Sequence, residues 1–183
     1  WSSDVCSSDL EGNSAAANAD PLVYDMMAAF YTACSSFIAQ NFGARKKKRI
    51  LQTYLICLFY SFITSLVLGV GIYLARYPFL YLFTSDKAVV EAGITRLSIM
   101  ALSYSASAFM DASIAASRGL GKTAVPTFVV VMGSCVFRII WIYTIFAYFH
   151  TIQSLYILYV FSWGITAIAE NIYFFHVYRH TLT

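Results

Sequence analysis

Five long apolar segments follow one another along the chain, separated by short polar stretches. Each has 20–26 residues, and together they cover 22–41, 50–75, 94–117, 126–149 and 153–178. An α-helix rises about 1.5 Å per residue, so each segment is long enough to cross a hydrocarbon core of about 30 Å. The pattern therefore predicts an all-α fold, a polytopic membrane helical bundle with five transmembrane helices.

The first 21 residues do not follow this pattern. The polar run Asp4-Val5-Cys6-Ser7-Ser8-Asp9-Leu10 resembles a translated sequencing adaptor, so we predict that residues 1–10 are a disordered artefact and exclude them from the fold. Small and polar residues from Glu11 to Pro21 predict a loop. We therefore expect the native part, 11–183, to be a fragment that lacks upstream spans.

The composition supports a membrane protein and gives no sign of an enzyme. The chain is 60% hydrophobic and 11% charged, whereas soluble domains average about 25% charged residues. No HExxH or GxSxG motif is present, and His150, His176 and His180 are not spaced as metal ligands. We predict no catalytic residues, no metal site and no cofactor.

Basic residues predict the orientation of the spans. Eight lie on one side of the predicted membrane and two on the other; the eight are Arg45, Lys46, Lys47, Lys48, Arg49, Arg118, Lys122 and Arg179, and the two are Arg76 and Lys87. Loops rich in Lys and Arg stay in the cytoplasm, so the basic loops are predicted to be cytoplasmic. The cluster at 45–49 follows a span directly, which favours contact with membrane lipid and not with nucleic acid.

A polar stripe runs along the third segment. At 100° per residue, five polar side chains fall within about 80° of one another; they are Arg96, Ser103, Ser107, Asp111 and Arg118. Such a stripe in an apolar helix is expected to face the bundle interior or a water-filled cavity.

Three charged residues lie at overlapping depths in three predicted spans. Measured by helical rise from the cytoplasmic side, Asp111 is at about 10 Å, Glu170 at about 13 Å and Arg138 at about 18 Å. One interpretation is a proton or cation site that lines a transport cavity, with Arg138 and Glu170 as electrostatic partners of Asp111. The other is an internal salt bridge that only holds the bundle together. The sequence leaves both open, and both can be true.

The order of short motifs resembles a known transporter family. Gln40-Asn41-Phe42-Gly43-Ala44-Arg45, followed by Arg49-Ile50, resembles the turn after the eighth helix of the multidrug and toxic compound extrusion (MATE) family. Gly12-Asn13-Ser14-Ala15-Ala16 resembles the loop before that helix.

Further motifs resemble later parts of the same family. Met110-Asp111, with Arg118-Gly119-Leu120-Gly121 and Pro126, resembles the end of the tenth helix and the turn that follows it. Cys135-Val136-Phe137-Arg138-Ile139-Ile140-Trp141-Ile142-Tyr143 resembles the eleventh helix. The resemblance runs from about residue 11 to 180 and implies helices eight to twelve, five of the six helices of the C-terminal lobe.

The resemblance also implies a function. Members of the family in bacterial cell membranes export drugs and other organic compounds by alternating access, driven by inward Na⁺ or H⁺. It places Ser107 where some members carry an acidic residue, one turn before Asp111. The expected partners are membrane lipid, a small organic substrate and the missing N-terminal lobe, without which the fragment is expected to be inactive.

Two other functions remain open. One is a lipid-linked saccharide flippase of the same superfamily, and the other is a membrane scaffold subunit that transports nothing. The candidate residues for cation coupling and the cavity are Asp111, Arg138, Glu170, Ser107 and Ser103. The candidate residues for the cytoplasmic turns are Gln40, Asn41, Gly43, Arg118, Gly119 and Gly121.

Overall fold

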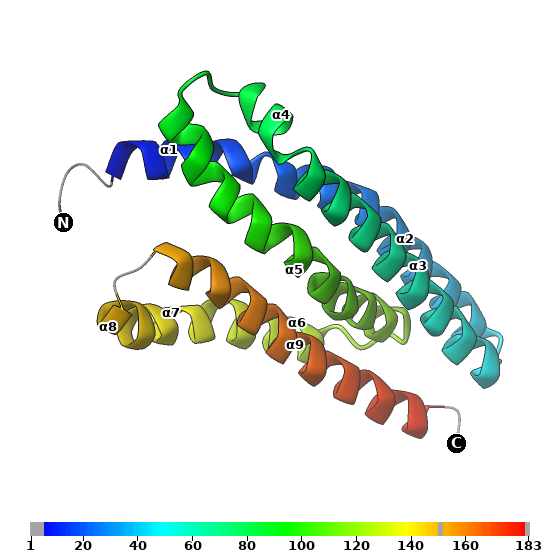
Figure 1. Ribbon diagram of the computed structural model, residues 1–183. Coiled ribbons are helices and arrows are strands. Elements are labelled where there is room, and N and C mark those ends of the chain that lie inside the picture. The colour runs from blue at the N-terminus through cyan, green and yellow to red at the C-terminus, as the bar shows by residue number, and fades with distance from the viewer. Residues whose placement is uncertain (1–5, 150–151, 182–183) are drawn as a thin grey trace.

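The computed structural model describes residues 6–149 and 152–181, and this part of the chain consists of helices and short turns without a strand (Figure 1). The elements are α1 Cys6–Ala17, α2 Ala19–Gly43, α3 Lys47–Leu74, α4 Arg76–Tyr81, α5 Lys87–Gly119, α6 Ala124–Val131, the π-helix η1 Met132–Val136, α7 Phe137–Trp141, the π-helix η2 Ile142–Phe146, α8 Ala147–Phe149 and α9 Ile152–His180. The predicted all-α helical bundle is confirmed.

The helices that can cross a membrane match the five predicted segments. Four helices are long and apolar enough to cross a membrane, namely Ser7–Gly43, Lys47–Leu74, Ala124–Phe146 and Tyr156–His180. The third predicted segment lies in a bent pair, Lys87–Ala101 and Ser103–Gly119, which makes a fifth span if its two halves cross the membrane together. The observed α5 begins seven residues before the predicted third segment, because Asp86 caps it by accepting a hydrogen bond from the Ala88 amide at 2.9 Å.

α5 is the central helix of the bundle. It packs against α1, α2, α3, α4 and α9, whereas the run from α6 to α8 contacts mainly α9 (Figure 1). Small residues allow close approach: a Cβ added to Gly69 of α3 would overlap the Ala101 carbonyl oxygen of α5. Membrane helices commonly pack through such small residues, because burial from water does not drive their association within lipid.

The predicted loop at Glu11–Pro21 is wrong, because these residues are helical in α1 and the start of α2. Residues 6–10 also belong to α1, so the predicted disorder does not hold for them, and residues 1–5 lie outside the described part. The reason is close packing on α5: a Cβ at Gly12 would lie 2.6 Å from the Val89 carbonyl oxygen. Small and polar residues are typical of a loop, but here they allow α1 to pack tightly against α5.

The turns predicted after the first and third segments are present. Asn41 lies in the last turn of α2, where its side-chain amide donates to the Phe37 carbonyl at 2.8 Å, and its own carbonyl accepts from the Lys46 amide at 2.9 Å. Gly121 has a φ of +75°, which favours glycine. Gly119 allows α5 to pack closely on α2, since a Cβ there would lie 2.7 Å from the Ser35 carbonyl oxygen of α2.

The other turn candidates mark the ends of helices. Gly43 ends α2, and the carbonyl of Gln40 accepts from the Ala44 amide at 3.0 Å. Arg118 lies in the last turn of α5. The turns after α2 and α5 and the last turn of α9 lie at one end of the bundle, and α4 lies at the opposite end (Figure 1).

Candidate functional site

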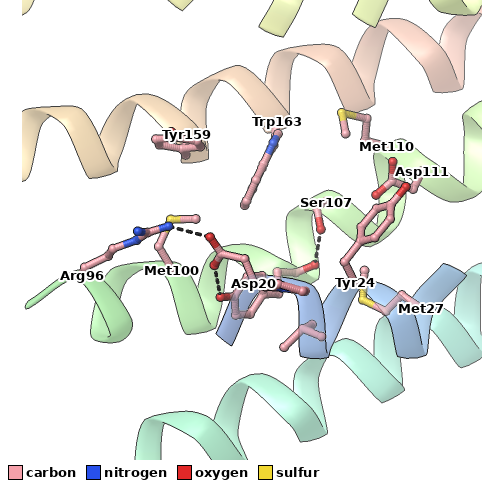
Figure 2. Close-up of a pocket in the computed structure, with 13 residues that line it drawn as sticks. Asp20, Tyr24, Met27, Arg96, Met100, Ser107, Met110, Asp111, Tyr159 and Trp163 are labelled. Carbon is pink, nitrogen blue, oxygen red and sulfur yellow. Dashed lines mark hydrogen bonds and ion pairs between the residues drawn. The ribbon is translucent and has the colours of Figure 1, made fainter. Parts of the chain in front are cut away.

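A cavity of about 390 Å³ lies between α2, α5 and α9 (Figure 2). Its lining combines three acidic or basic side chains with tyrosine, tryptophan and methionine. The lining residues are Asp20, Pro21, Val23, Tyr24 and Met27 of α2, Arg96, Met100, Tyr104, Ser107, Met110 and Asp111 of α5, and Tyr159 and Trp163 of α9. Mostly apolar walls with a few polar groups are typical of sites for small organic molecules.

A charged network closes one side of this cavity and joins the first two helices to α5. The Arg96 guanidinium donates to one carboxylate oxygen of Asp20 at 2.5 Å, and the Tyr104 hydroxyl donates to the other oxygen at 2.5 Å (Figure 2). Arg96 also donates to the backbone oxygen and the side-chain oxygen of Asn13 in α1, at 2.7 and 3.0 Å. Both charges are therefore compensated within the protein.

Asp111 lies elsewhere along the cavity and is not part of that network. In the described part of the chain, the ion pair within 4 Å is the one between Arg96 and Asp20, and Asp111 makes none. Figure 2 shows the Asp111 carboxylate beside the ring of Tyr24, below Met110. Aromatic and thioether groups adjoin it, and Arg118 on the same helix acts on it electrostatically without forming an ion pair among the described residues.

The predicted polar stripe on α5 does face cavities. Arg96, Ser107 and Asp111 line the first cavity. Arg118 lines a second one of about 330 Å³, which adjoins the first because Tyr24 contributes to both. Ser103 differs: it is buried, and its hydroxyl donates to the Ile99 carbonyl within α5 at 2.7 Å.

The proposed grouping of Asp111, Arg138 and Glu170 is not found in the structure. No ion pair joins any two of them among the described residues. The Arg138 guanidinium instead lies 4.2 Å from the ring centre of Tyr159, and Glu170 is fully buried. Equal depth along three helices did not imply contact, because the rise along a helix does not fix which way its side chains face.

Several lining residues were missed by the sequence reasoning. Asp20 lies in the predicted loop, and Tyr159 and Trp163 lie in the fifth predicted span, where they do not stand out from the other apolar residues. A signal for Asp20 was present in the chain: Arg96 stands inside a predicted span, and an arginine there needs an acidic partner. A signal for the aromatic pair was their four-residue spacing, which places both on one helix face.

The lining of the cavity offers several kinds of contact to a small molecule. In the described residues there is no group of three His, Cys, Asp or Glu side chains that could hold a metal ion. Asp111 offers a negative charge, Tyr159 and Trp163 offer aromatic faces, and Met27, Met100 and Met110 offer adaptable apolar surface. An amphipathic organic molecule with a positive charge matches this combination.

Comparison with solved structures places the fold among known transporters. A MOP superfamily transporter from Pyrococcus furiosus superimposes with a TM-score of 0.78 at 17% identity, covering 96% of this chain and 43% of that one. The Vibrio cholerae MATE transporter VcmN in its bent form gives a TM-score of 0.72 at 18% identity, covering 89% and 40%. This chain thus spans less than half the length of either. At these identities the likeness shows a shared fold.

The family itself is shown by a sequence model. No curated protein matches the chain. The MatE family model matches residues 1–144, which is most of the chain and includes all of the cavity lining except its two α9 residues. This chain therefore belongs to the MatE family of membrane transporters.

Proposed function

We propose that this chain is part of an antiporter that exports organic compounds and is driven by an inward Na⁺ or H⁺ gradient. The observation that carries the proposal is Asp111, a carboxylate without an ion-pair partner in the described part of the chain, placed in an aromatic cavity. A coupling cation and a cationic substrate would compete for that negative charge. Competition of this kind links the movement of one to the movement of the other.

Alternating access requires that the cavity open first to one side of the membrane and then to the other. Three helices of this chain supply one wall, since the lining residues come from α2, α5 and α9. We infer that a second helical lobe supplies the facing wall. Export would then follow from rocking of the two lobes around the substrate, with Asp111 taking up the coupling cation after the substrate leaves.

The test is efflux from cells that express the complete coding sequence containing this chain. A fluorescent organic cation is loaded, and the Na⁺ and pH gradients are collapsed separately. We expect efflux to stop with one of the two gradients, which also names the coupling ion. Asp111→Asn should reduce gradient-driven efflux to the level of cells without the protein, while the amount of protein in the membrane stays unchanged.

Asp25→Asn is the matched control, since Asp25 is an exposed acidic residue of α2 that does not line the cavity. It should leave efflux at the wild-type level. Normal efflux in Asp111→Asn would refute the coupling role of that carboxylate. Absence of efflux under every gradient, with wild-type protein present in the membrane, would refute the antiporter.

A second candidate function is a lipid-linked saccharide flippase, and Arg138 is the observation that favours it. Its guanidinium stacks on Tyr159, which lines the cavity, and it has no acidic partner among the described residues. A fixed positive charge beside an apolar cavity suits a phosphate-bearing lipid. Reconstituted full-length protein that flips a lipid-linked saccharide, and loses this activity in Arg138→Gln, would support the flippase over the antiporter.

A further inference from the structure

A second acidic residue lies deep in the bundle, outside the cavity. Glu170 of α9 has an exposed fraction of 0%, and neither of its carboxylate oxygens has a hydrogen-bond partner among the described residues. It is not among the residues that line the cavity. An ionised carboxylate without a partner is costly to bury, so the group needs an occupant that removes its charge.

Glu170 is aligned with the cavity but separated from it by an apolar layer. Trp163 lines the cavity, and a seven-residue spacing puts Glu170 on nearly the same face of α9, about 10 Å further along the helix. Between them Ala167 packs against Met110 and Ile114 of α5, in a buried apolar cluster. Glu170 lies beyond this layer along α9 and does not line the cavity.

The polar groups near Glu170 in the sequence and on the facing helices form hydrogen bonds with one another. The Tyr54 hydroxyl of α3 lies 2.9 Å from the Ser113 hydroxyl of α5 and donates to the Asn171 side-chain oxygen of α9 at 2.5 Å. Asn171 in turn donates to the Ala167 carbonyl at 2.8 Å. This network adjoins Glu170 in sequence, yet no group in it donates to the Glu170 carboxylate.

The charged and titratable side chains of the surrounding helices make no ion pair with Glu170 among the described residues. On the helices around α9 they are Asp111 and Arg118 on α5, Tyr54 on α3, Cys135 on η1 and Arg138 on α7, and α6 has none. Arg118 acts on Glu170 electrostatically without forming an ion pair with it. A metal cation such as Na⁺ would need several oxygen ligands, which the unpartnered carboxylate alone does not supply. A proton needs only one carboxylate oxygen.

We propose that Glu170 is a proton-binding site, separate from the cavity and held behind the layer formed by Met110, Ile114 and Ala167. Binding adds one proton to the carboxylate and gives a neutral carboxyl group, and release returns that proton to water when the layer opens. The proton site itself is independent of the transported compound. Its use in a transport cycle rests on the proposed function.

The experiment is infrared difference spectroscopy on the purified full-length protein over a pH titration. A protonated carboxyl group has a carbonyl-stretch band that an ionised one lacks. The comparison is made in an Asp111→Asn background, so that this second unpaired carboxyl does not contribute. In that background we expect the band to be present near neutral pH and to lose its Glu170 part when Glu170→Gln is added. Glu91→Gln is the matched control, since Glu91 is an exposed acidic residue of α5, and it should keep the band.

The outcomes separate this proposal from the others. The proton-site proposal is overturned if Glu170→Gln keeps a band of wild-type intensity, or if the wild type shows no band. It is also overturned if adding Na⁺ at constant pH removes the band. The Gln side chain has the size of Glu, so Glu170→Gln should fold. If that variant is not recovered, Glu170→Met tests the same infrared band. Absence of efflux would refute the antiporter but would leave the infrared result unaffected.

Discussion

Asp20 and Asp111 line the same cavity from different helices. Asp20 accepts hydrogen bonds from Arg96 and Tyr104, so both of its oxygens are occupied by the protein. Asp111 makes no ion pair in the described part of the chain. A carboxylate that is already neutralised by an arginine has little free-energy reason to take up a cation, whereas an unpaired one in an apolar wall has a strong reason. We therefore propose a structural role for Asp20 and a binding role for Asp111.

Removal of the Asp20 carboxylate should destabilise the bundle. Asp20→Ala leaves the 8%-exposed Arg96 with only the Asn13 oxygens and deprives Tyr104 of its acceptor. Hydrogen bonds to charged groups contribute about 1.5–3 kcal/mol each, so we expect a loss of stability of that order. The measurement is the thermal unfolding midpoint of the full-length protein in detergent. Asp25→Ala should unfold at the wild-type temperature, and equal midpoints for the two variants would contradict this role of Asp20.

The contact between α3 and α5 depends on a glycine. A Cβ at Gly69 would overlap the Ala101 carbonyl oxygen, whereas a Cβ at Gly71, two residues further along the same helix, meets nothing within 4 Å. We expect Gly69→Ala to destabilise by about 1–3 kcal/mol through overpacking. Gly71→Ala should stabilise by about 0.5–1 kcal/mol, because alanine is the better helix former. Thermal unfolding of both variants measures the difference, and a stable Gly69→Ala would mean that α3 and α5 separate at this point.

The spans were predictable because their apolar runs are long and uninterrupted. The helix of the first residues was not, since Gly12 and Ala16 form no such run and are buried only by contact with α5 and its neighbours. The bend of α5 was also hidden, because apolar residues continue through it.

The candidate site was predictable only where the pattern lies within one helix. Periodicity within one helix correctly put Ser107 and Asp111 on a cavity-facing stripe. The grouping of Asp111 with Glu170 failed, because helical rise fixes the depth of a residue but not the rotation of its helix about its own axis. Asp111 lines the cavity and Glu170 does not.

The whole molecule has an uneven distribution of charge between its two ends. The basic cluster 45–49, with Arg118, Lys122 and Arg179, lies at the end formed by the turns after α2 and α5 and by the end of α9 (Figure 1). Contacts hold this end together, since the Lys47 ammonium donates to the Arg179 carbonyl at 3.0 Å and lies 5.4 Å from the ring centre of Tyr178. At the other end, Arg76 begins α4 and Lys87 begins α5.

Because basic loops are retained in the cytoplasm, this end should face the cytoplasm. The measurement uses full-length protein with its native cysteines replaced and one cysteine introduced at an exposed position, Lys48→Cys or Ser85→Cys. A maleimide that cannot cross membranes should label Ser85→Cys in intact cells and Lys48→Cys only after permeabilisation. The reverse labelling pattern would show that the bundle has the opposite orientation in the membrane. Glu170 would then lie between the cavity and the outer surface, and its proton would be exchanged with the opposite side of the membrane.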